Sequence, residues 1–136
     1  MLADLVASLF SYAVLLSGLS GDVPPFLSFQ PKEFFVTHAC GGSPNCNAVG
    51  WYPATGGDTI YLLNTLNIEN PIVDSIIVHE SVHYLQFQHG KFADRSCANS
   101  LALEYQAYGV QKEYLLREGD VANGVGMSVI SMHCEE

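Results

Sequence analysis

Two histidines and a glutamate within residues 79–83 have the types and the spacing of a zinc site. His79-Glu80-Ser81-Val82-His83 matches the pattern H-E-x-x-H, and apolar residues on both sides indicate a buried helix. Four helical residues advance about 400°, so both imidazoles project from nearly the same face, one turn apart. Both can bind one metal ion, and Glu80 can act as general base toward a water on that ion. Because an unpaired imidazole or carboxylate is costly to bury, the apolar flanks favour a bound metal.

A catalytic zinc needs a third protein ligand, and the sequence offers Glu104 and His89. Glu104 lies in a segment with helical apolar spacing and strong helix formers, and a second helix packed on the first would bring it to the metal. His89 has the spacing of the third histidine in the metzincin pattern H-E-x-x-H-x-x-G-x-x-H, but Gln86 occupies the glycine position. In a continuous helix His89 lies about 80° off the face of His79. We therefore predict Glu104 as the third ligand, with a metzincin-like site using His89 as the alternative.

An H-E-x-x-H helix followed by a helical glutamate resembles the gluzincin group of zinc peptidases. The length is similar to that of the shortest members, the minigluzincins and related short bacterial proteins. The similar region runs from about residue 50 to 119, and Trp51-Tyr52 and Thr59–Asn64 resemble the strand pair that precedes the active-site helix. Four residues after the ligand glutamate, thermolysin-like enzymes have an Asp that orients a ligand histidine, whereas this chain has Tyr108.

The resemblance implies zinc-dependent hydrolysis of peptide bonds, by an endopeptidase rather than an exopeptidase. His79, His83 and Glu104 would hold Zn²⁺ with water in the fourth position. Glu80 would take a proton from that water and deliver it to the leaving amine. Tyr and His are the usual residue types that stabilise the oxyanion, and the sequence leaves four candidates: Tyr52, Tyr105, Tyr108 and His133.

A non-catalytic or autoinhibited zinc-binding module is the alternative from a different functional class. A partner, or the tail residues 133–136, would then fill the fourth position, since these residues all carry groups that bind zinc. Glu80 favours catalysis, because a purely structural site has no need of an acidic residue there. The expected partner is a peptide or protein substrate, whose backbone would add to an edge strand, most plausibly Thr59–Leu63.

Composition and charge fit one small domain without nucleic-acid partners. The chain has 136 residues, of which 49% are hydrophobic, and this is enough for one sizeable core. Its net charge of −9 argues against nucleic acid and against anionic membrane surfaces. The apolar first twenty residues lack a basic start, contain Asp4 and are too short to span a bilayer. We therefore predict a helix there, and expect that any signal peptide has been removed from this sequence.

Four cysteines indicate an oxidising compartment, periplasmic or secreted. Turn residues fill Cys40–Cys46, which favours a short disulfide-closed loop. Cys97 and Cys134 would then pair, although four cysteines allow three connectivities. A second zinc bound by cysteines is the weaker alternative because no C-x-x-C pair is present, and four free thiols in the cytosol are a further one.

Apolar periodicity predicts three helices, and β-type runs between turn residues predict a small sheet. The first helix covers about 2–17, with a core stripe at helical spacing of Leu2, Leu5, Val6, Leu9, Phe10, Ala13 and Leu16. The others run over 71–89, with Asn70 as N-cap, and over 96–117. The candidate strands are 33–38, 48–52 and 59–63, while Pro24-Pro25 and Pro31 mark an extended linker and 120–136 has no definite element.

These elements and the resemblance together predict an α+β fold, a minimal zincin-like domain spanning residues 1–136. It would contain an N-terminal helix, a small, mostly antiparallel sheet, the active-site helix and the helix that carries Glu104.

Overall fold

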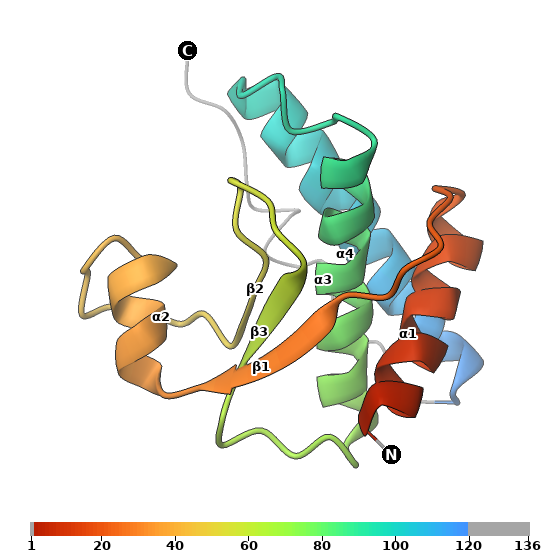
Figure 1. Cartoon of the computed structure of the whole chain (residues 1–136), viewed down its shortest axis with the longest axis horizontal. Helices are drawn as coiled ribbons and strands as arrows, with labels where there is room; N and C mark the ends of the chain where they lie inside the picture. Colours follow the sequence, from red (N-terminus) through yellow and green to blue (C-terminus); the bar gives the residue numbers. More distant parts are fainter. Residues whose placement is uncertain (1, 120–136) are drawn as a thin grey trace.

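The computed structural model describes residues 2–119, which form four helices and a three-stranded sheet (Figure 1). This architecture confirms the predicted α+β class. The elements in chain order are α1 (Leu2–Ser17), β1 (Phe26–Gln30), α2 (Lys32–His38), β2 (Gly50–Trp51), β3 (Thr59–Leu63), α3 (Pro71–Gln88) and α4 (Cys97–Arg117).

The sheet is mixed, with strand order β1-β3-β2, and this differs in two ways from the sequence-based expectation. The longer pairing is parallel, from Phe26 opposite Thr59 to Gln30 opposite Leu63, whereas β2 pairs antiparallel with β3. β3 is therefore the central strand, and the prediction that it is an edge strand was wrong. The cause is β1, which lies where the prolines predict a linker. The prolines at 24, 25 and 31 flank this segment without interrupting it, so its backbone can pair with β3.

The segment 33–38, predicted as a strand, is the short helix α2. Pro31 occupies the N-cap position with extended backbone, and Glu33 lies in the first turn, both of which suit a helix start. Helical geometry buries Phe35 and places Phe34 against Trp51 and Tyr61 of the sheet, with ring centroids 6.0 and 4.8 Å apart. This aromatic packing outweighs the β propensity of the local sequence.

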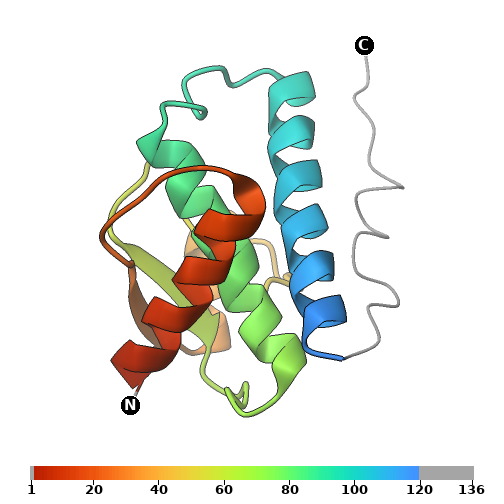
Figure 2. The same ribbon diagram turned by 90° about the vertical axis from the view of Figure 1, so that its right-hand side faces the viewer.

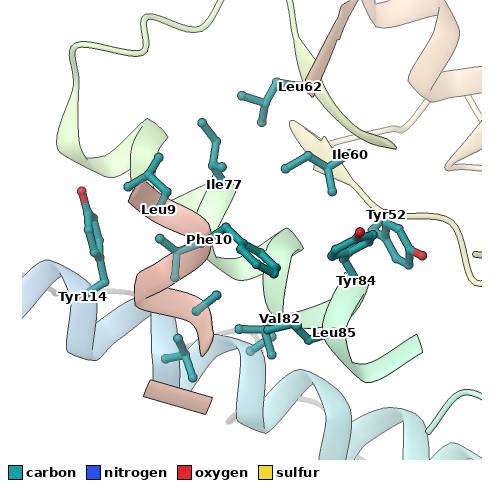
Figure 3. Close-up of a cluster of buried hydrophobic side chains, with 14 of the residues drawn as sticks. Leu9, Phe10, Tyr52, Ile60, Leu62, Ile77, Val82, Tyr84, Leu85 and Tyr114 are labelled. Atoms are coloured by element: carbon teal, nitrogen blue, oxygen red, sulfur yellow. The ribbon is translucent and has the colours of Figure 1, made fainter. Parts of the chain in front are cut away.

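Helix α3 is the centre of the core and lies between the sheet and the other long helices. Figure 1 shows α2 on one side of the sheet and α1, α3 and α4 on the other, and Figure 2 shows these three helices packed together. Alternate residues of β3, Ile60 and Leu62, point toward α3, as Figure 3 shows. The predicted stripe of α1 is confirmed by its four buried members Val6, Leu9, Phe10 and Ala13.

The helix starts predicted for α3 and α4 are confirmed by side-chain caps. The Asn70 side chain accepts a hydrogen bond from the Ile72 N–H at 2.9 Å, and the Ser96 hydroxyl accepts one from the Asn99 N–H at 3.1 Å. Each bond satisfies a donor that the first turn of a helix would otherwise leave unpaired. The caps therefore fix where α3 and α4 begin. They thereby also fix how far along each helix the site residues lie.

A disulfide joins Cys40 to Cys46, as predicted, and closes the loop after α2. Such bonds are typical of oxidising, extracellular environments. The second predicted pairing, Cys97 with Cys134, extends beyond the described residues. Within residues 2–119, no helix combines the length and the apolar character needed to cross a bilayer.

Asp74, in the first turn of α3, predicts a pH-dependent stability. Its Oδ1 atom is buried without a hydrogen-bond partner within residues 2–119. Burial, reinforced by the negative charge of Glu118, raises the pKa of Asp74 from 3.8 to about 6. The folded state thus holds this proton more tightly than the unfolded state. Ionisation of Asp74 therefore lowers the free energy of unfolding as the pH rises from about 4 through about 6. Below about 4 it has no such effect.

We expect Asp74→Asn to raise the melting temperature at pH 7.5 by a few degrees and to change it little at pH 4. The asparagine keeps the size of the side chain but carries no charge to desolvate. Thermal denaturation at both pH values measures the difference. The exposed Asp22→Asn is the matched control, and an equal effect of the two variants at pH 7.5 would contradict the assignment.

Candidate metal centre

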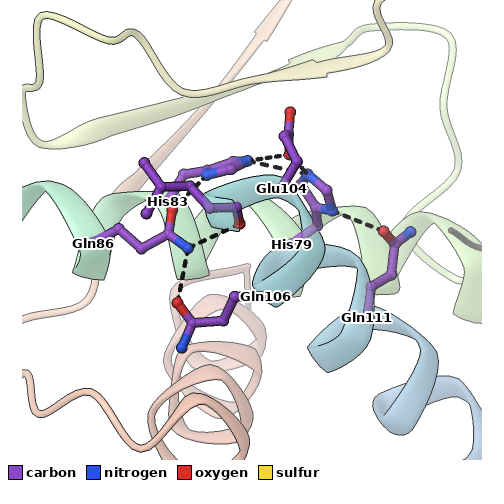
Figure 4. Close-up of polar contacts among 7 residues, drawn as sticks. His79, His83, Gln86, Glu104, Gln106 and Gln111 are labelled. Atoms are coloured by element: carbon purple, nitrogen blue, oxygen red, sulfur yellow. Dashed lines mark hydrogen bonds and ion pairs between the residues drawn. The ribbon is translucent and has the colours of Figure 1, made fainter. Parts of the chain in front are cut away.

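Helices α3 and α4 bring three potential ligand atoms together, as Figure 4 shows. The Nε2 atoms of His79 and His83 are 3.2 Å apart. Glu104 Oε1 lies 3.2 Å from the first of these nitrogens and 2.8 Å from the second. Ligand atoms about 2.0–2.2 Å from a tetrahedral ion are separated by roughly 3.3–3.6 Å, so the two spacings of 3.2 Å are close to those of a metal site and the third is shorter. The group could therefore hold a metal ion.

His89, the alternative third ligand, is not part of this group. It is the C-cap of α3, and its exposed ring lies 2.8 Å from the Ser20 carbonyl oxygen through Nε2. Gly90 follows with a φ of +72°, so the helix ends only after His89. The chain does not turn back at Gln86, which is where a metzincin-like arrangement needs it to leave the helix.

A chain of hydrogen bonds fixes the orientation of the His79 ring. This series of hydrogen bonds starts at the Ile72 carbonyl oxygen, which can only accept. The Ser75 hydroxyl donates to it at 2.6 Å. That hydroxyl accepts from Nε2 of Gln111 at 3.0 Å, so the Gln111 Oε1 atom faces His79 Nδ1 at 2.9 Å. Because an amide oxygen only accepts, Nδ1 of His79 must carry a proton. The Nε2 atom of His79 therefore faces Glu104, at 3.2 Å from Oε1.

A second, independent chain fixes His83 in the same way. Nε2 of Gln86 donates to the Leu103 carbonyl at 3.0 Å and to Gln106 Oε1 at 2.9 Å. Gln86 Oε1 thus faces His83 Nδ1, at 2.8 Å, and accepts its proton (Figure 4). Both imidazoles therefore turn Nε2 toward the same point, where the two nitrogens, 3.2 Å apart, need a proton or a metal ion between them and the Glu104 carboxylate. This arrangement fits a metal ion.

The orienting role of both glutamines was not predicted from the sequence. The sequence pattern shows Gln86 only as the residue at the metzincin glycine position, and it assigns no role to Gln111. Helical spacing contained a signal, because Gln111 lies seven residues after Glu104 and so on the same helix face. Gln111 rather than Tyr108 therefore bonds to His79 Nδ1.

In the absence of an ion, a proton would hold the three side chains together. Burial lowers the pKa of His83, but its hydrogen bond to Glu104 and the nearby charge of Glu80 outweigh that effect and raise the pKa to about 9. For Glu104, burial raises the pKa, but the bonds to both histidines outweigh burial and lower it well below the usual range. A metal ion would have to displace this proton, so loading releases a proton at neutral pH.

Glu80 lies beside the three converging side chains without being one of them. It is only 8% exposed, and its carboxylate accepts a hydrogen bond from the backbone N–H of Tyr52. Burial raises the pKa of Glu80, while the two histidines oppose that shift. A Cβ atom on Gly50 would lie 3.4 Å from Glu80 Oε2 and 2.5 Å from Ile76 Cγ2, so only glycine allows β2 to approach α3 this closely. The close approach places the carboxylate next to an edge strand.

A cavity of about 550 Å³ opens over the metal-binding group. Its walls come from β2 and the residues after it, from α3, from α4 and from the loop between these helices. Of the four candidates for oxyanion stabilisation, only Tyr108 lines this cavity with its hydroxyl not committed elsewhere in the described part of the chain. Its ring packs against His79 with centroids 4.4 Å apart.

The other candidates are less suitably placed. The Tyr52 hydroxyl donates to the Gly57 carbonyl at 2.8 Å. Tyr105 is half-exposed and does not line the cavity, and His133 lies outside residues 2–119. Tyr108 therefore remains as the candidate that lines the cavity and has an uncommitted hydroxyl within residues 2–119.

In comparisons with known proteins, no family model, no curated protein and no solved structure matches this chain. The functional argument therefore depends on the chemistry of the site itself.

The hydrogen bonds that Gln86 and Gln111 make to the two histidines lead to a prediction for metal affinity. We expect Gln111→Leu to weaken zinc binding by about 10–100-fold, because His79 then loses the acceptor that holds its tautomer. Gln111→Glu keeps an acceptor oxygen at the same place and should retain most of the affinity. Competition with a zinc-sensitive dye measures both constants. Equal affinities for Gln111→Leu and the unaltered chain would remove the orienting role of Gln111.

Proposed function

We propose that this protein is a zinc-dependent peptidase with His79, His83 and Glu104 as metal ligands. The observation that carries the proposal is that two separate hydrogen-bond chains hold the Nε2 atoms of both histidines toward one carboxylate oxygen. Two imidazoles and one carboxylate are a ligand set that zinc uses in catalytic sites, where the remaining position stays open. The cavity above the group gives a substrate access to that position.

Each side chain has a definite task in this proposal. A zinc ion bound there would acidify a water molecule and polarise the peptide carbonyl. The Glu80 carboxylate, buried beside the ligands, takes a proton from the attacking water and delivers it to the leaving amine. Tyr108, which lines the cavity, is the candidate donor to the carbonyl oxygen as negative charge develops. The glutamines at 86 and 111 keep the imidazoles from rotating.

The substrate backbone would bind along β2 rather than β3. Among residues 2–119, strand β2 has only β3 as a neighbour in the sheet, and both residues of β2 line the cavity. An extended peptide could therefore pair with the free edge of β2 and pass over the metal site. This placement also suits an endopeptidase, because an edge strand accepts a chain that continues in both directions.

The proposal includes a periplasmic or secreted location, supported by the Cys40–Cys46 disulfide. The resemblance to gluzincins remains a prediction about family. The alternative of a non-catalytic or inhibited module needs a partner or the tail residues 133–136 in the fourth position, and those tail residues lie outside the described residues.

The test is hydrolysis of a complex peptide mixture by the purified chain supplied with one equivalent of zinc, followed by mass spectrometry. We expect new cleavage products that disappear after treatment with chelator and return when zinc is restored. A chain that binds one zinc tightly yet cleaves nothing would contradict the peptidase and leave the zinc-binding module.

A further inference from the structure

One arginine, Arg95, lines the cavity from the loop between α3 and α4. Of the five Lys and Arg residues in the chain, only Arg95 lines the cavity. Apart from the two histidines of the metal-binding group, the other charged residues of the lining are acidic: Glu80, Asp94 and Glu104. The whole protein also has a net charge of −9, so Arg95 is a local exception in a negative environment.

Arg95 has no partner of its own within residues 2–119, where it makes neither an ion pair nor a side-chain hydrogen bond. Its neighbour Asp94 is engaged elsewhere, because Asp94 Oδ1 accepts a hydrogen bond from the Ser96 N–H at 2.9 Å. That bond turns the carboxylate toward the start of α4. The exposed guanidinium of Arg95 therefore keeps its five donors available to a ligand.

The loop that carries Arg95 is anchored at several points, although it has no regular secondary structure. The Asn99 side chain donates to the carbonyls of Lys91 and Asp94, both at 2.8 Å. Phe92 packs against Phe87 with ring centroids 5.8 Å apart, and also contacts Tyr52 and His83. The backbone beside Arg95 is thus held in place, which limits the entropy lost when a ligand binds.

We propose that Arg95 forms a subsite for a carboxylate group of the peptide substrate. A planar guanidinium binds a carboxylate through two parallel hydrogen bonds, and no other Lys or Arg lines this cavity. The carboxylate could be the C-terminus of the peptide or an acidic side chain, since both present the same group. This inference depends on the proposed function for the identity of the ligand as a peptide, and it adds a specificity to that function.

The test measures binding rather than cleavage. It uses the Glu80→Gln chain with one equivalent of zinc, so that the probe is not consumed. The first probe pair is an N-acetylated neutral hexapeptide with either a C-terminal carboxylate or a C-terminal amide. In the second pair both peptides are amidated and differ only by Glu or Gln at one internal position. Trp51, the only tryptophan, lines the same cavity, so its fluorescence can report binding, with calorimetry as a second readout.

Within at least one pair, we expect the peptide with the extra carboxylate to bind about tenfold more tightly at low salt, as a charge-assisted hydrogen bond predicts. Arg95→Gln should remove that preference and leave the affinity for the neutral member unchanged. Lys91→Gln removes the same charge from the same loop, outside the cavity lining, and should keep the preference. A preference in the first pair identifies the chain terminus, and one in the second pair identifies a side chain.

The proposal is overturned if neither pair is discriminated, or if Arg95→Gln weakens both members of a pair equally. Its failure is separate from that of the peptidase assignment. A chain that cleaves peptides but ignores the carboxylate would refute only the subsite. A chain that discriminates carboxylates through Arg95 but never hydrolyses a peptide would refute only the peptidase.

Discussion

Glu80→Gln is expected to reduce peptide hydrolysis by about 10²–10⁴-fold, which is the usual contribution of a general base. The metal content should stay near one ion per chain, because the Glu80 carboxylate is not among the three converging ligand atoms. The glutamine has the same shape, and its amide oxygen can still accept the hydrogen bond from the Tyr52 N–H. What it loses is the ability to take a proton from water.

Metal analysis and the value of kcat/KM for a cleaved peptide check this expectation together. Glu113→Gln is the matched control, because Glu113 is a surface residue of α4 paired with Arg117 and does not line the cavity. It should keep full activity. Undiminished hydrolysis by Glu80→Gln would remove the general-base assignment. Complete loss of metal with the fold intact would instead make Glu80 a ligand.

Glu104→Ala should weaken zinc binding by orders of magnitude, because two imidazoles from one helix rarely hold a catalytic zinc alone. It should also change the response to metal removal. In the unaltered protein an ion would link α3 to α4, so chelator should lower the melting temperature by favouring the unfolded state. In Glu104→Ala that link is already lost, and chelator should have almost no effect.

His89→Ala is the control that separates the two candidate ligands. It should lose only the contact with the Ser20 carbonyl, at a cost of about 0.5–1.5 kcal/mol in the free energy of unfolding, and retain the metal. Zinc content at neutral pH and thermal denaturation with and without chelator measure both variants. Loss of metal in His89→Ala, with retention in Glu104→Ala, would support a metzincin-like site and refute Glu104 as third ligand.

The sequence alone determined the features that depend on short-range spacing. The period of apolar residues, together with the cap at Asn70, predicted the three long helices, because a helix is closed by bonds between residues four apart. The same short period is sufficient to place His79 and His83 on one helix face. The turn residues between Cys40 and Cys46 likewise predicted a disulfide loop that the structure contains.

Only the tertiary structure decided the features that depend on which distant segments meet. Strand β1 exists because β3 offers it a parallel partner some thirty residues away, and α2 is a helix because Phe34 packs on the aromatic residues of the sheet. β3 is central for the same reason, and within residues 2–119 the edge strand beside the site is β2.

The packing of α4 on α3 likewise brought Glu104 and Gln111 to the two histidines, whereas His89 ended outside the group. Local spacing could place each of these residues on a helix face. It could not determine which faces pack together, because that depends on the burial of apolar surface over the whole chain.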